Sequence, residues 1–170
     1  MENNKKTKQN RKIRKTKSRT KNKQQSVGMT MAWDDLKTGR ILAKAIKKQG
    51  VKIFTGENFN KHESLYTQET KLIMENDWTI MLVTNNYLDR LNQDNSGCTR
   101  ELSVLTNKQD IHKTIMVVTD TLDKNKEKDM PSSYFLIKQK IYYEFSKQQP
   151  KNTLQTIADK IAETIKNTPK

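Results

Sequence analysis

Cysteine and histidine are almost absent from this sequence. Among 170 residues, Cys98 is the only cysteine, and the two histidines are His62 and His112. One thiol cannot form an internal disulfide or a cysteine-rich zinc site, and neither histidine has HExxH-type spacing. We therefore expect no metal site.

Long apolar runs and glycine-rich phosphate loops are also missing. No stretch of about 18 residues is continuously apolar, so we expect no transmembrane segment, and the N-terminus lacks the apolar region of a secretory signal. Neither GxGxxG nor GxxxxGK[ST] occurs, which argues against a nucleotide held tightly by such a loop. These absences predict a cytoplasmic protein without a bound cofactor.

Acidic residues are scarce at the N-terminus. Residues 1–24 contain 8 lysines and 3 arginines but only one acidic residue, Glu2, in a chain of formal net charge +14. Such a segment buries too little apolar surface to offset its conformational entropy. We predict a disordered polybasic tail at 1–26 and one folded domain at 27–168. The tail would bind an anionic partner, nucleic acid or a membrane surface, or act as a nuclear-import signal; a purely solubilising role is the alternative.

The remaining sequence alternates between strand-like and helix-like segments. Asp34 or Asp35 is expected to cap the first helix and Gly50 to end it. Residues 85–98 and 123–133 are predicted as loops. Strands are expected within 28–35 and at 51–54, 78–84, 113–120 and 141–145, and helices at 34–49, 64–77, 99–109 and 153–166. This alternation predicts an α/β fold in which a mostly parallel five-stranded central sheet carries helices on both faces.

Ligands of such sheets bind beyond the carboxyl ends of the strands. The loops after Trp33, Phe54, Thr84 and Thr119 are therefore the expected functional region. One carboxylate nearby, Glu101, has two interpretations. It is either a solvated charge that favours the helix dipole or the residue that carries the chemistry.

The order of these landmarks resembles a Toll/interleukin-1 receptor (TIR) domain, from about Gly28 to Lys166. The segments that carry the resemblance are "KKQGVKIF", "MENDWTIMLVTNNYLDRLNQDNSGCTREL" and "IMVVTD", the last followed by Met130-Pro131. The resemblance implies a flavodoxin-like fold. It also implies partners, namely further copies of this chain or other TIR domains.

Similarity to the TIR domains that cleave NAD+ implies a catalytic role for Glu101, three residues after Cys98. NAD+ would then be a substrate whose nicotinamide–ribose bond is hydrolysed. Cleavage of this bond develops positive charge on the ribose, which a carboxylate stabilises, and nicotinamide is already a cationic leaving group that needs no general acid. The residues expected to bind the substrate are Trp33, Asp34, Phe59, Asn86, Tyr87 and Cys98.

Several positions differ from the usual TIR pattern. Gly97 stands where a tryptophan is frequent, Thr55 follows the second strand in place of an acidic residue, and His62 lies near an expected glycine. Two alternatives to NAD+ cleavage therefore stay open. One is a non-catalytic TIR scaffold in signalling or defence, and the other is an enzyme related to nucleoside deoxyribosyltransferases.

Overall fold

The computed structural model describes residues 24–119, 121–146 and 153–169. Residues 1–23 of the predicted tail lie outside the described residues, so its disorder and its anionic partner stay predictions. The first strand begins at Ser26, which lies within the range predicted as tail.

A five-stranded parallel sheet forms the centre of the domain. Its strands are β1 (Ser26–Thr30), β2 (Lys52–Thr55), β3 (Trp78–Val83), β4 (Thr114–Thr119) and β5 (Ile141–Phe145), in the order β2-β1-β3-β4-β5. Every neighbouring pair is parallel. Gly28 of β1 is in register with Phe54 and Thr79 on its two sides. This strand order is flavodoxin-like and confirms the predicted α/β fold class.

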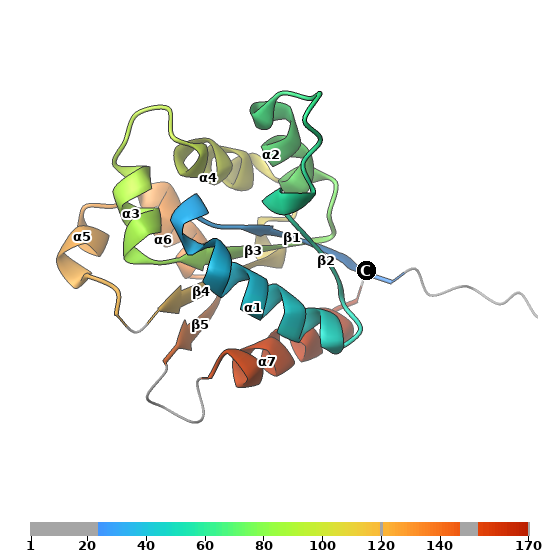
Figure 1. The fold of residues 1–170 in the computed structure, drawn as a ribbon. Helices are drawn as coiled ribbons and strands as arrows, with labels where there is room; N and C mark the ends of the chain where they lie inside the picture. Colours follow the sequence, from blue (N-terminus) through green and yellow to red (C-terminus); the bar gives the residue numbers. More distant parts are fainter. Residues whose placement is uncertain (1–23, 120, 147–152, 170) are drawn as a thin grey trace, which may run out of the picture.

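Helices cover both faces of the sheet (Figure 1). One face carries α1 (Leu36–Lys48) and α7 (Leu154–Asn167), and the other carries α2 (Leu65–Met74), α3 (Asn85–Leu91), α4 (Gly97–Asn107) and α6 (Ser132–Lys138). The short helix α5 (Lys124–Lys128) precedes α6. Single 3-10 turns lie at η1 (Trp33–Asp35), η2 (Gly56–Asn58) and η3 (Ile111–Lys113). In the described part of the chain, no helix has the length and apolar character needed to cross a membrane.

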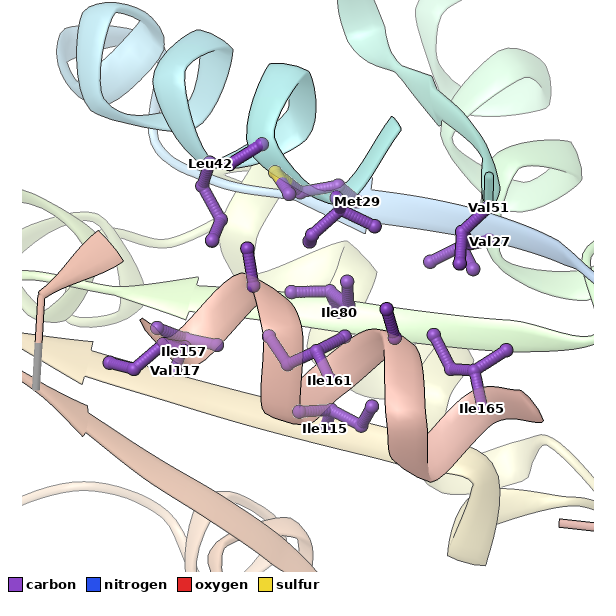
Figure 2. Close-up of a cluster of buried hydrophobic side chains, with 14 of the residues drawn as sticks. Val27, Met29, Leu42, Val51, Ile80, Ile115, Val117, Ile157, Ile161 and Ile165 are labelled. Atoms are coloured by element: carbon purple, nitrogen blue, oxygen red, sulfur yellow. The ribbon is translucent and has the colours of Figure 1, made fainter. Parts of the chain in front are cut away.

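Alternation of side chains along the central strands builds two cores. Ile80 and Ile115 point toward α7, where Ile157 and Ile161 meet them (Figure 2). Their neighbours in sequence, such as Met81 and Met116, enter the opposite core. Burial on both faces requires apolar side chains at successive positions, which explains the continuous apolar runs of β3 and β4.

Two segments predicted as loops contain helices. Residues 85–91 form α3, whose N-terminus is capped by the Thr84 hydroxyl, which accepts a hydrogen bond from the Tyr87 amide at 3.1 Å. Residues 124–128 form α5, capped by the Asp123 carboxylate, which accepts from the Asn125 amide at 2.9 Å. The loop predictions were wrong here because a capping side chain stabilises a helix too short to show a periodic pattern.

The C-terminal end of α1 is as predicted, whereas its N-terminal cap is not. Gly50 has a φ of 80° and its amide donates to the Lys47 carbonyl at 3.0 Å, which is a glycine-based helix end as predicted. Asp35 stands at the N-cap position, but its side chain makes no capping bond. Its carboxylate accepts hydrogen bonds from Thr84 and Asn86. The Asp35 carboxylate thus makes tertiary hydrogen bonds in place of the predicted capping bond.

Candidate functional site

Glu101 lies in the second turn of α4, on the buried face of that helix. The helix begins at Gly97 and is capped by the Ser96 hydroxyl, which accepts a hydrogen bond from the Thr99 amide at 3.1 Å. Glu101 is only 7% exposed and faces inward together with Leu102. The interpretation of Glu101 as a solvated helix-start charge is therefore wrong.

The Glu101 carboxyl is buried without a full set of partners. Its Oε2 atom has no hydrogen-bond partner among the described residues. Burial raises the pKa of Glu101 well above its usual range, the nearby carboxylate of Glu69 raises it further, and the Arg100 guanidinium opposes both. In the ligand-free protein this carboxyl therefore favours the neutral form. A buried, unsatisfied carboxyl of perturbed pKa in a cavity is typical of functional sites.

Two cavities meet at Glu101. The larger has a volume of about 420 Å³ and lies between η1, α2, the α3–α4 connection and α4. The smaller, about 20 Å³, is closed by Gly56 and Phe59 after β2. Trp33, Glu69 and Glu101 line both cavities. The site is thus built from segments that follow β1, β2 and β3.

Sequence reasoning missed Glu69 and Arg100. Glu69 of α2 is 4% exposed, and its Oε2 accepts hydrogen bonds from Arg100 Nη2 at 3.2 Å and Nε at 3.3 Å. A signal was present, because Glu69 interrupts the helical spacing of Leu65, Leu72 and Ile73. A charged side chain among the apolar positions of a helix requires a buried partner.

The departure at Gly97 has a structural explanation. A Cβ atom added at Gly97 would lie 2.9 Å from Oε1 of Glu69. This distance is too short for an unperturbed contact, so the Glu69 carboxylate fills space that a side chain at position 97 would need. Any side chain at position 97, including the tryptophan frequent there in TIR domains, would require the Glu69 carboxylate to shift.

Four of the predicted site residues are brought together at these cavities. Trp33 is 53% exposed and lies at their boundary with Glu101. Phe59 is half-buried in the wall of the smaller cavity, and Cys98 lines the larger one. Burial and the carboxylate of Glu101 raise the pKa of Cys98 to about 12. The thiol is therefore neutral at physiological pH and unsuited to act as a nucleophile.

The other three predicted substrate-binding residues lie elsewhere. Tyr87 is fully buried in the core beneath α3. Asp34 pairs with Arg90 at 3.1 Å. Asn86 donates to Asp35 at 2.9 Å and lines a separate pocket of about 350 Å³ at the carboxyl ends of β3 and β4. None of the three lines the cavities at Glu101.

A metal ion has no evident site in this region. Within the part of the chain that the structure describes, no group of three or more histidine, cysteine, aspartate or glutamate side chains is arranged to hold one. Glu69 and Glu101 line both cavities and Asp94 lines the larger one, and Arg100 already pairs with Glu69.

No protein-family model matches the chain, and no curated protein matches it. Among solved structures, the chain is similar to the TIR domains in the structure of the activated Roq1 resistosome directly recognizing the pathogen effector XopQ. The sequence identity is 16%, the match covers 85% of each chain, and the TM-score is 0.47. The chain has a flavodoxin-like α/β fold, and its resemblance to TIR domains rests on the motifs around Glu101.

Proposed function

We propose that this TIR-like domain hydrolyses the nicotinamide–ribose bond of NAD+ and that Glu101 is its catalytic residue. The observation that carries the proposal is a buried carboxyl with an unpaired oxygen in the wall of a cavity of about 420 Å³. Burying a carboxyl without a full set of partners is costly, so we infer that a ligand supplies the missing partner. A cation is the partner that a carboxylate binds most strongly.

The reaction suits a site with one such carboxyl. When the bond breaks, its electron pair leaves with nicotinamide, which becomes neutral, and positive charge moves to the ribose. The ionised Glu101 carboxylate stabilises that charge. Water then adds to the ribose carbon and loses a proton, so that the products are nicotinamide, ADP-ribose and a proton.

Protonation of Glu101 is coupled to substrate binding. Burial favours the neutral acid in the empty site, whereas the positive pyridinium ring of NAD+ favours the carboxylate. Arrival of the ring therefore releases a proton from Glu101. The substrate itself switches the carboxyl into the form that the reaction needs.

Trp33 supplies the second element of the proposed site. Its indole is half-exposed and borders both cavities together with Glu101. An aromatic face attracts a cationic ring. We assign Trp33 the role of stacking on nicotinamide, with Phe59 behind it in the smaller cavity.

The proposal is tested by nicotinamide release from NAD+ at high protein concentration, comparing wild type with Glu101→Gln. Loss of the carboxylate removes charge stabilisation in the transition state, so we expect release to fall by roughly 10²-fold or more. Glu163→Gln, at an exposed position on α7, is the matched control and should keep wild-type activity. Equal release by wild type and Glu101→Gln would refute the assignment.

A second candidate function is that of an interaction module. Trp33 and, at the start of α2, Leu65 and Tyr66 are exposed apolar side chains, and Trp33 and Leu65 line the larger cavity. A second copy of this chain or another TIR domain would bury them. Sedimentation of the samples used for the activity assay separates the two functions. Assembly without nicotinamide release, unchanged in Glu101→Gln, would favour the interaction module.

A further inference from the structure

We infer that Glu69 is a positioning residue. By engaging Arg100 in the space that Gly97 leaves open, its carboxylate holds the guanidinium away from Glu101 and keeps the Glu101 carboxyl free for a cationic ligand. The identity of that ligand rests on the proposed function. The arrangement of the three side chains does not, so it can be tested separately.

Glu69 and Glu101 are the two carboxyl groups on which Arg100 acts. Arg100 is adjacent to Glu101 in sequence and lines the same cavity. Its positive charge acts on Glu101 and lowers the pKa of that carboxyl. Its Nη2 and Nε atoms donate to Glu69 Oε2, and its Nη1 donates to the Asn95 carbonyl at 2.5 Å. The guanidinium is thus held by groups from α2 and from the α3–α4 connection.

The pairing of Glu69 with Arg100 requires open space beside residue 97. Glu69 comes from α2, and its Oε1 occupies the position where a side chain at residue 97 would project. Gly97 is the first residue of α4, directly after the Ser96 cap. A larger residue there would require the Glu69 carboxylate, which pairs with Arg100, to move. The position of the Glu69 carboxylate therefore depends on the absence of a side chain at Gly97.

Burial is the main cause of the raised pKa of Glu101, and the charged neighbours Glu69 and Arg100 act on it in opposite directions. Cys98 on α4 and Tyr87 on α3 also lie near Glu101; burial raises the pKa of both, so both are neutral at physiological pH. Arg90 and Asp94 line the same cavity as Glu101, and Arg90 pairs with Asp34. Glu69 and Arg100 are then the charged neighbours that act on Glu101, and their mutual pairing leaves it without a cation of its own.

The decisive experiment is a ¹³C NMR titration of glutamate carboxyl groups in the full chain, with the Glu101 signal assigned by its loss in Glu101→Gln. In Glu69→Gln the guanidinium is free to turn to Glu101. We expect the pKa of Glu101 to fall by about 1–3, as is usual for a carboxyl next to a guanidinium. The double variant Glu69→Gln/Arg100→Gln removes the competing cation and should bring the pKa of Glu101 back up.

The same variants separate a positioning role from a purely structural one. Nicotinamide release should fall in Glu69→Gln and recover in the double variant, because Glu101 is free again. If Glu69→Gln fails to fold, Gly97→Ala displaces Glu69 without changing any charge and should also lower the pKa of Glu101. An unchanged pKa of Glu101 in the folded variant, or a double variant that matches Glu69→Gln, would overturn the inference. If wild type releases no nicotinamide, the proposed function fails, while the titration still decides the role of Glu69.

Discussion

Glu101 illustrates a conflict between stability and chemistry at the scale of a single residue. An ionised carboxylate in a buried position is costly unless it is paired. The guanidinium of Arg100, which lines the same cavity as Glu101, is engaged by Glu69. The folded protein is therefore most stable when Glu101 is a neutral acid. A cationic substrate would favour the ionised carboxylate instead.

This conflict predicts how stability depends on pH. The folded pKa of Glu101 lies well above its usual range, whereas an unfolded glutamate titrates near about 4.3. Between these values the folded state binds more protons than the unfolded state, so the contribution of Glu101 to stability falls as pH rises. The loss is at most about 1.4 kcal/mol for each pH unit.

Glu101→Gln should remove this dependence. We expect the variant to unfold at a higher temperature than wild type at neutral pH, with an advantage that shrinks toward acidic pH. Thermal unfolding of both proteins across a pH series measures the difference. A constant difference between the two melting temperatures at every pH would contradict the raised pKa.

Sequence could identify part of the site at this scale. Glu101, Trp33, Phe59 and Cys98 were predicted as site residues, and each lines at least one of the two cavities, while their roles stay predictions. The pairing of Glu69 with Arg100 could not be predicted, since the two residues lie on different helices and are 31 residues apart in sequence.

At the scale of elements, the placement of α2 decides where Glu69 lies. A Cβ on Gly28 would meet the Leu72 carbonyl oxygen at 2.0 Å, so α2 packs directly on the backbone of β1. The other anchor is Lys108, whose Nζ donates to the carbonyls of Ile73 and Asn76, both at 2.9 Å. A cation at the C-terminus of a helix satisfies its last carbonyls and its dipole.

Lys108→Met should therefore destabilise the protein. Burial already lowers the pKa of Lys108, yet its removal leaves carbonyls at the end of α2 unsatisfied. We expect a loss of about 1–3 kcal/mol in the free energy of unfolding. Urea unfolding of the variant measures it, and Lys44→Met, at an exposed position on α1, is the control. Equal stability of the two variants would contradict an anchoring role for Lys108.

Elements with long apolar patterns were predicted, whereas short capped elements were not. The strands β3 and β4 follow from their continuous apolar runs, and the helix α7 follows from its side-chain periodicity. In contrast, α5 and α6 depend on tertiary contacts. Glu127 of α5 accepts hydrogen bonds from Tyr134 at 2.8 Å and Lys138 at 2.6 Å, both on α6. Such a network between two short helices leaves no periodic signal in sequence.

At the scale of the whole molecule, the strand order assembles the site. Because β1 lies between β2 and β3, the turn η1 after β1 is close to both η2 and the α3–α4 connection. The alternation of strands and helices predicted the sheet, and the general rule for parallel sheets pointed to these connections. The cavities themselves could not be predicted, since side chains from several connections and from two helices line them.

The most direct test of the central claim is to compare the binding of the 1-methylnicotinamide cation with that of neutral nicotinamide by calorimetry at mildly alkaline pH. Only the folded molecule brings Trp33 and Glu101 together. A charge-assisted contact contributes about 1.5–3 kcal/mol, so wild type should bind the cation roughly 10–100-fold more tightly than the neutral ring, and Glu101→Gln should lose this preference. Equal affinity of wild type for the two rings would contradict the account, because Glu101 would then not be the group that receives positive charge.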